Sequence, residues 1–331
     1  MAEKVINSKC ACGSVLIYTR SNLIMVDPCE HILHTKCLSS HTECPLCGVA
    51  ITGTYTSAQL RGADAPNLYQ KYVDMTAMTN FDTIYRPRRK FFNMIDIMGI
   101  VSKIPFISGF SAGQKVCRDL FCLMDSKIVA HGLHHIRPGP KVFVANHTSY
   151  LDFAVIFYLL KCGFLASSVI RDIWLGKQIM NIVPLLITDR GKSENTVEKM
   201  REYVEQNGSI CLFPEGMITH PDTIIRFRTG AFHVGYPILP VVIRYEPVIY
   251  DTNIKRFIEK LISEPKITIH VDVLPQELPP FSESRIEEIR TKMAHAGNMA
   301  LSRVSNKDIN DDEVRRKERE RRARRAKGKN N

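Results

Sequence analysis

The sequence lacks long uninterrupted apolar runs. A membrane-spanning helix needs about 18 or more consecutive apolar residues, and the charged side chains of Asp96, Lys103, Lys161 and Arg171 interrupt the most apolar segments of this chain. The sequence also lacks the apolar core of a secretory signal peptide near its start. We therefore expect no clear transmembrane span and no secretory leader.

Outside its C-terminal tail, the chain has little excess of either charge. The net charge is +11, from 45 Lys and Arg against 34 Asp and Glu. Residues 315–329 contain seven Arg, three Lys and two Glu, so this tail carries +8 and the rest of the chain only +3. A charge of this size does not require nucleic acid as a partner, and we expect none for the folded part. The tail is typical of a solvated segment, and its charge suits an anionic lipid surface or nucleic acid equally well.

Six of the ten cysteines lie within the first 47 residues, interleaved with histidines. Paired thiols and imidazoles are ligands that tetrahedral zinc prefers, and eight of them suffice for two ions. The eight candidates are Cys10, Cys12, Cys29, His31, His34, Cys37, Cys44 and Cys47. Because so short a segment buries little apolar surface, we expect two structural zinc ions to stabilise it. A disulfide-linked secreted domain is the alternative, and the histidines and the missing signal peptide argue against it.

The order of these ligands resembles a RING finger of the two-histidine kind. That resemblance implies a cross-brace in which Cys10, Cys12, His34 and Cys37 hold one zinc, and Cys29, His31, Cys44 and Cys47 hold the other. Two features depart from the family. Only one residue separates Cys10 from Cys12, so His41 is an alternative ligand, and Gly48 stands where many active RING ubiquitin ligases carry a cation. The resemblance therefore implies zinc binding more strongly than it implies ubiquitin transfer with a ubiquitin-conjugating enzyme as partner.

The candidate chemistry begins where a strand is followed by a helix. The apolar run Lys141–Ala145 predicts a buried strand, and Leu151–Leu160 is apolar and long enough to begin a helix. Between them lie His147 and, five residues later, Asp152. An imidazole suits removal of a hydroxyl proton near neutral pH, and a carboxylate on its other nitrogen would orient it. Five residues of regular helix span about 500°, so the pair can meet only if the chain between them is partly a turn. Thr148 and Ser149 are good capping residues for a helix starting there.

Alone, this spacing is common, and a core histidine beside a helix-capping aspartate explains it as well. Three further blocks follow it in order, as Ile187–Arg190, Phe213–Gly216 and Ile238–Val241. The four blocks together resemble the glycerolipid acyltransferase family, whose members use acyl-CoA to acylate glycerol phosphate, lysophosphatidic acid and other lysophospholipids. The resemblance covers roughly residues 86–274.

The resemblance implies a role for each matching residue. His147 would be the general base, Asp152 would orient it, and Arg190, Glu215 and Gly216 would bind the acyl acceptor. A guanidinium such as Arg190 can bind the phosphate of a lysophospholipid through two hydrogen bonds. Arg228 would be a second phosphate or CoA contact, or equally a solvated charge. Met217 stands where threonine is usual, which puts the acceptor specificity in doubt more than the activity.

The expected fold class is α/β, with a central mixed sheet flanked by helices and a small N-terminal two-zinc domain. Strands are predicted within 180–188, 210–213, 237–244 and 267–274, and a helix within 194–206. The strand ends would bring His147, Arg190 and Glu215 together. The capping-box spacing of Ser284 and Glu287 predicts a C-terminal helix.

We divide the chain into a RING-like domain at 1–52, a linker at 53–90, the acyltransferase domain at 91–280 and a C-terminal helix with basic tail at 281–331. The cluster Arg86–Lys90 precedes the apolar segment Met94–Phe110. Such a sequence suits an anchor in the membrane interface, although helices packed on the domain would explain it equally. An enzyme that uses lipids favours the anchor.

The sequence therefore predicts an acyl-CoA-dependent enzyme that acylates the free hydroxyl of a lysophospholipid or lysophosphatidic acid, with membrane lipids and acyl-CoA as its partners. The sequons at Asn146 and Asn207 and the zinc thiolates favour the cytoplasmic side of an intracellular membrane, with peripheral or monotopic attachment. The alternative is an interaction protein or ubiquitin ligase that works through its zinc module and carries an inactive acyltransferase domain.

Overall fold

The computed structural model describes residues 10–12, 23–38, 41–56, 74, 77, 98–100, 102–172, 177, 179–188, 195–251, 253–264 and 266–311. The chain divides into two compact units. The first contains Met1–Ile84, Thr223–Arg226 and Ala300–Asn331, and the second contains Tyr85–Asp222 and Phe227–Met299. Most of the expected linker, the basic cluster Arg86–Lys90 and the tail 315–329 lie outside the described residues.

The first unit is built on a small antiparallel sheet of order β2-β1-β3. Its strands are β1 (Leu23–Asp27), β2 (His31–His34) and β3 (Gly53–Thr56), and the short helix α1 (Thr35–Leu38) follows β2 directly. Met25, Val26 and Leu33 are fully buried or nearly so and form its small core. The same unit contains a parallel pair, β9 (Thr223–Arg226) with β12 (Ala300–Ser305), next to which Asp74 accepts hydrogen bonds from Ser302 and Arg303.

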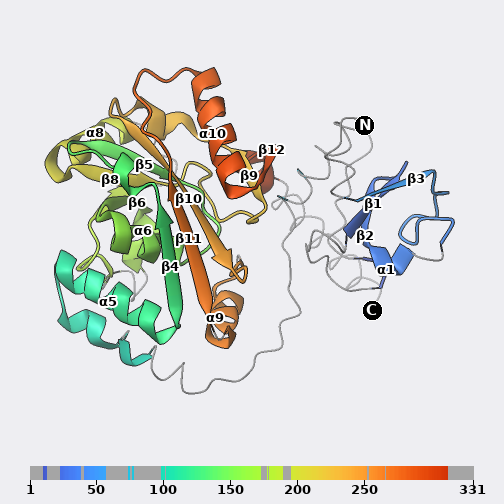
Figure 1. Cartoon of the computed structure of the whole chain (residues 1–331), viewed down its shortest axis with the longest axis horizontal. Helices are drawn as coiled ribbons and strands as arrows, with labels where there is room; N and C mark the ends of the chain where they lie inside the picture. The colour runs from blue at the N-terminus through green and yellow to red at the C-terminus, as the bar shows by residue number, and fades with distance from the viewer. Residues whose placement is uncertain are drawn as a thin grey trace, which may run out of the picture. The chain divides into compact units, whose positions relative to one another are not determined.

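The second unit is built on a seven-stranded sheet of order β4-β11-β10-β5-β8-β6-β7 (Figure 1). The strands are β4 (Ser126–His131), β5 (Lys141–Ala145), β6 (Gly163–Ser167), β7 (Leu185–Thr188), β8 (Ser209–Leu212), β10 (Ile238–Glu246) and β11 (Ile267–Val273). Only β10 and β11 pair antiparallel, and the other neighbours are parallel. The predicted α/β class with a central mixed sheet is confirmed.

Alternate residues of each strand point to opposite sides of this sheet, so both faces present side chains, and helices pack on both of them. Val241 and Ile243 of β10 join the main core, to which α5 (Phe110–Leu123), α6 (Asp152–Leu160) and α9 (Ile254–Ser263) contribute. Val242 points to the other face, where it lies against α10 (Glu283–Gly297) at Gly297. The helix α8 (Thr196–Asn207) packs on β7 and β8. Short 3₁₀ helices complete the unit at Ile104–Phe106, Leu133–His135, Ser168–Asp172 and Thr229–His233.

Both helices predicted from capping residues are present, but their expected capping residues were wrong. The helix α6 begins at Asp152, with Leu151 at its N-cap, and Thr148 and Ser149 belong to the preceding turn. The helix α10 is capped by Ser282, whose hydroxyl oxygen accepts a hydrogen bond from the Arg285 N–H at 3.2 Å, and not by Ser284. At α10 a neighbouring serine takes the cap, whereas α6 has no side-chain cap and Asp152 instead accepts the N–H groups of Thr148 and Ser149 before the helix.

Candidate active site and zinc-ligand clusters

The strand β5 delivers the candidate catalytic turn, and Asn146 fixes where the strand ends. Asn146 is fully buried, and its side chain donates to the carbonyl of Ile243 at 3.0 Å and accepts from the N–H of Ile243 at 2.8 Å. The side chain thus continues the pairing of β5 with β10 one step beyond Ala145 and Val241. This contact holds the next residue, His147, just beyond the carboxyl end of β5.

His147 and Asp152 are joined by a direct hydrogen bond. The distance from His147 Nδ1 to Asp152 Oδ2 is 2.9 Å, and both side chains are buried or nearly so. Since an ionised carboxylate can only accept, Nδ1 carries the proton and Nε2 has the free lone pair. The pair meets because residues 146–149 are not helical, so the chain turns before α6 begins. An imidazole held in this tautomer is suited to accept a proton at Nε2.

Asp152 is also the centre of a wider network. Its Oδ2 accepts the N–H groups of Thr148 at 2.8 Å and Ser149 at 2.9 Å, which closes the turn. Its Oδ1 accepts the hydroxyl of Tyr245 at 2.6 Å. Burial, followed by the charge of Asp152, raises the pKa of Tyr245 well above its usual value, so the phenol keeps its proton and remains a donor. The sequence analysis missed Tyr245, which lies 93 residues away on β10.

Aromatic side chains hold the imidazole ring in place. The ring of His147 stacks on Phe213 with centroids 4.2 Å apart, and it meets the edge of Phe153 at 5.4 Å. Phe153 in turn contacts Phe164 of β6 at 5.2 Å. The ring therefore has apolar walls on two sides, which limits the orientations that it can adopt.

Glu215 lies buried beside the backbone of His147. Its Oε1 accepts the N–H of His147 at 2.9 Å, and its Oε2 accepts the hydroxyl of Thr219 at 2.7 Å. The N–H of Thr219 donates back to the carbonyl of His147 at 2.8 Å. The end of β8 is thus tied to the end of β5, and this carboxylate is placed to support the backbone of His147.

Gly216 and Arg228 lie together at the more exposed rim of this turn. Gly216 has a φ of +71°, and a Cβ there would lie 2.8 Å from the Nε of Arg228. The N–H of Arg228 donates to the carbonyl of Pro214 at 2.8 Å, which brings the arginine over the turn. The positive φ therefore favours glycine here, and a Cβ would also require the Arg228 side chain to shift. Arg190 lies outside the described residues.

Next to this turn is a buried polar cluster that the sequence analysis did not identify. Lys260 pairs with Asp251 at 3.2 Å, and the ring of His220 meets the edge of Tyr250 at 5.3 Å. Burial, with a smaller contribution from the charge of Lys260, lowers the pKa of His220 to about 3. His220 is therefore neutral at physiological pH, and its Nδ1 accepts the N–H of Asp222 at 3.3 Å.

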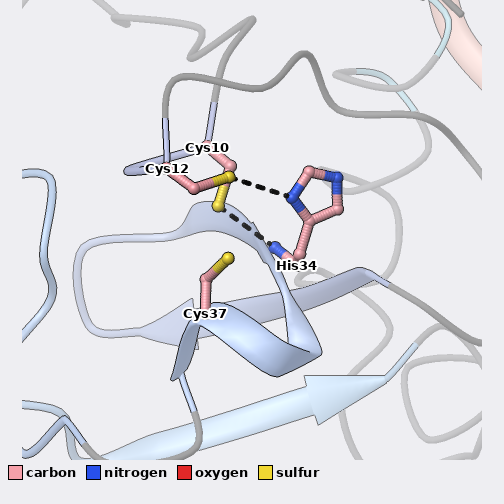
Figure 2. A group of neighbouring side chains, drawn as sticks. All are labelled: Cys10, Cys12, His34 and Cys37. Carbon is pink, nitrogen blue, oxygen red and sulfur yellow. Dashed lines mark hydrogen bonds between the residues drawn. The ribbon is translucent and has the colours of Figure 1, made fainter. Parts of the chain in front are cut away.

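The N-terminal cysteines and histidines form two groups of four. One contains Cys10, Cys12, His34 and Cys37, and the other contains Cys29, His31, Cys44 and Cys47. Within each group the ligand atoms lie within 4.8 Å of one another, and Figure 2 shows the first group with its thiols turned toward one another beside His34. The membership is the same as that of the sets implied by the RING resemblance, and His41 belongs to neither group. Four soft ligands so close together fit a tetrahedral zinc ion.

The strand β2 links the two groups. His31 at its start belongs to one group and His34 at its end to the other. The N–H of His34 also donates to the Sγ of Cys10 at 3.4 Å, as second-sphere donors to metal thiolates do. The two groups are therefore interleaved along the chain, and each takes one ligand from β2.

The comparisons with known proteins find similarity for the central part of the chain. Residues 127–244, which contain His147, Asp152, Glu215, Gly216 and Arg228, match the family model described as Acyltransferase. This part of the chain is therefore similar to an acyltransferase domain.

Several curated acyltransferases are similar to the chain over part of its length. The chain is 30% identical to "Lysophospholipid acyltransferase LPEAT1" of Arabidopsis thaliana over 196 residues, which are 52% of this chain and 48% of the relative. It is 35% identical to "Lysophosphatidylcholine acyltransferase 1" of Homo sapiens over 31% of this chain and 20% of that protein. It is 26% identical to "1-acyl-sn-glycerol-3-phosphate acyltransferase alpha" of Mus musculus, over 40% of this chain and 50% of that protein. The chain thus spans about half or less of the length of these relatives.

Among solved structures, the crystal structure of the 1-acyl-sn-glycerophosphate (LPA) acyltransferase PlsC from Thermotoga maritima is similar. It has a TM-score of 0.46 and 17% identity, with 65% of this chain and 83% of that chain covered. Within the described part of the chain, no helix is both long and apolar enough to cross a membrane.

Proposed function

We propose that this protein transfers an acyl group from acyl-CoA to the free hydroxyl of a lysophospholipid or lysophosphatidic acid. The observation that carries the proposal is the buried bond between His147 Nδ1 and Asp152 Oδ2, within a domain of the acyltransferase family. The names of the relatives, which include lysophospholipid and 1-acylglycerol-phosphate acyltransferases, support this substrate class.

In the proposed reaction, Nε2 of His147 takes the proton of the acceptor hydroxyl as its oxygen attacks the thioester carbon. The C–O bond forms and the C–S bond breaks, and the protonated His147 returns its proton to the departing sulfur, so CoA leaves as the thiol with no acyl-enzyme formed. Asp152 orients the imidazole and stabilises it when it is protonated. Arg190 and Arg228 would bind the acceptor phosphate, Gly216 would leave room for it, and Glu215 would hold the backbone of His147.

Membrane lipids would supply the acceptor, which favours peripheral attachment on the cytoplasmic side of an intracellular membrane. Met98 and Phe106, within the apolar segment 94–110, are 66% and 88% exposed. Large apolar side chains this exposed are costly in water and suit the membrane interface. The buried Asn146 cannot carry a glycan in this fold, which agrees with a compartment without N-glycosylation.

We further propose that the two N-terminal groups each bind a structural zinc ion. Thiolates and imidazoles within 4.8 Å of one another support this. A zinc module of this kind would serve docking or regulation, and a ubiquitin-conjugating enzyme is one candidate partner. The alternative function, an interaction protein with an inactive acyltransferase domain, predicts no acyl transfer at all.

The test is transfer of labelled oleoyl-CoA onto a panel of lysophospholipids, using membranes that contain the wild type or His147→Ala. Loss of the general base should slow the reaction by about 100- to 10,000-fold. His134→Ala is the matched control, because His134 is exposed and stacks only on the neighbouring His135 among the ring contacts of the described residues. If neither the wild type nor His147→Ala acylates any acceptor, the alternative function as an interaction protein is favoured.

A further inference from the structure

The helix α9 lies at the catalytic end of the sheet. The strand β10 runs parallel to β5, so both strands end on the side that carries His147, and α9 follows β10 after residues 247–253 (Figure 1). The ring of Phe257 in α9 packs on Tyr150 of the catalytic turn, with centroids 5.0 Å apart. The helix α9 therefore packs beside the turn that carries His147.

The apolar face of α9 is wider than the protein covers. At about 100° per residue, Phe257, Leu261, Ile254, Ile258 and Ile262 fill an arc of about 140° around the helix. Phe257 and Leu261 at one side of the arc are buried in the main core, whereas Ile254 and Ile258 are 49% and 41% exposed. Val248, just before the helix, is 58% exposed. The uncovered half of the arc and Val248 form a second apolar surface, here called the α9 surface.

Cations border the α9 surface. Lys255 is exposed and lies about 20° beyond the apolar arc, and Lys266 is exposed shortly after the helix ends. Lys260, in contrast, points inward to Asp251. Glu259 lies farther round the helix, at about 60° from the arc. Apolar side chains next to cations match the interface of a bilayer that contains anionic lipid, where the apolar groups enter the acyl boundary and the ammonium groups reach the headgroups.

We propose that the α9 surface docks onto a lipid bilayer that contains anionic lipid, and so holds the catalytic end of the domain against the membrane. The proposal rests on the proposed function in one respect, because a lysophospholipid acceptor that resides in the bilayer needs a path to His147. Docking through α9 gives that path, since the lipid then enters the site sideways from the same surface.

A local probe tests the docking without relying on activity or on the segment 94–110. The chain has a single tryptophan, Trp174. In a Trp174→Phe background, Ile258→Trp places the only tryptophan on the α9 surface. Leu278→Trp is the matched control, because Leu278 is 67% exposed and follows Glu277, which pairs with Ile238 at the opposite end of β10.

The full-length variants are mixed with phosphatidylcholine–phosphatidylserine vesicles whose acyl chains are brominated. Bromine quenches tryptophan only when the ring enters the acyl region, so Ile258→Trp should be quenched and Leu278→Trp should not. Equal quenching of the two variants, or none in either, overturns the proposal. If α9 instead binds a protein partner or a second copy of the chain, neither tryptophan should be quenched.

Kinetics supply an independent readout. The exposed parts of Ile254 and Ile258 together amount to nearly one isoleucine side chain. Moving that much apolar surface out of water should raise the partition of the protein from water to membrane by about 10- to 100-fold. Changing both residues to Asp should lower kcat/KM for a vesicle-borne lysophospholipid by up to that factor. The rate on a short-chain acceptor free in solution should stay unchanged. Equal losses of kcat/KM on the two acceptors would overturn the proposal. If the wild type acylates neither acceptor, the proposed function is refuted, but the quenching experiment still tests the docking.

Discussion

Glu215 can be assigned a role by kinetics, because its two candidate roles predict different changes. As an acceptor-binding group it would contribute to KM, whereas as a buried support it would act through His147 on kcat. Its two oxygens accept from the His147 N–H and the Thr219 hydroxyl, and the side chain is fully buried. We therefore expect the supporting role.

Glu215→Ala would leave the buried N–H of His147 without this acceptor. An unsatisfied buried donor costs about 1–3 kcal/mol, which corresponds to about 5- to 150-fold in rate if all of it is lost in the transition state. We expect kcat to fall by a factor in this range while KM for the lysophospholipid changes little. Glu215→Gln should lose less, because the amide oxygen can still accept from His147 while the Thr219 hydroxyl turns to accept from the amide nitrogen.

Initial rates with varied acceptor at saturating oleoyl-CoA separate kcat from KM, and thermal unfolding of each variant reports any loss of fold. Glu277→Ala is the control, since Glu277 is also buried but pairs with Arg285 and Lys292. It should lower stability and leave kcat unchanged. A raised KM with unchanged kcat in Glu215→Gln would refute the supporting role and show that the carboxylate binds the acceptor.

Three further predictions follow from other contacts. Tyr245→Phe removes a donor to Asp152, so it should lower the free energy of unfolding, measured by denaturant titration, by about 1.5–3 kcal/mol. Burial lowers the pKa of His220 from 6.5 to about 3, so the unfolded chain binds more protons between these values and stability should fall by up to about 1.4 kcal/mol per pH unit below pH 6.5. Denaturant titrations at several pH values should show a shallower fall for His220→Gln, and an unchanged slope would contradict the assignment. Metal analysis should find about two zinc ions per chain and a lower content in His31→Ala, but an unchanged content in His41→Ala.

Five strands of the large sheet were predicted from the sequence because each leaves a local apolar signal, whereas β4 and β6 were not predicted. A strand buried on both faces is apolar at almost every position, as in Lys141–Ala145, which the structure has as β5 with the same bounds. The cap of α6 could not be predicted in this way. Capping propensity favoured Thr148 and Ser149, but the carboxylate of Asp152 accepts both of their N–H groups and closes a turn instead. A hydrogen bond backward along the chain competes here with the usual forward cap.

The contacts that cross the sheet had no such signal. Tyr245 reaches Asp152 only because β10 lies beside β5 in one register and because Val241, Ile243 and Tyr245 share a face. The alternation along 241–245 could have identified the face, but no residue pattern fixes which strand is the neighbour. The supporting role of Glu215 depends on the same kind of information, since β8 must pair with β5 for its end to meet His147.

Most of the polar residues around the catalytic turn serve to hold a single ring. Asn146 sets the end of β5 against β10, Glu215 holds the backbone N–H of His147, and Asp152 takes its Nδ1. These three side chains are fully buried, so we expect them to act through His147 and not directly on a substrate. Substitutions among them should therefore reduce kcat, whereas substitutions at the more exposed Gly216 and Arg228 should change KM for the acceptor. The division follows from burial, because a group that substrate cannot reach can affect the reaction only through the residues that it positions.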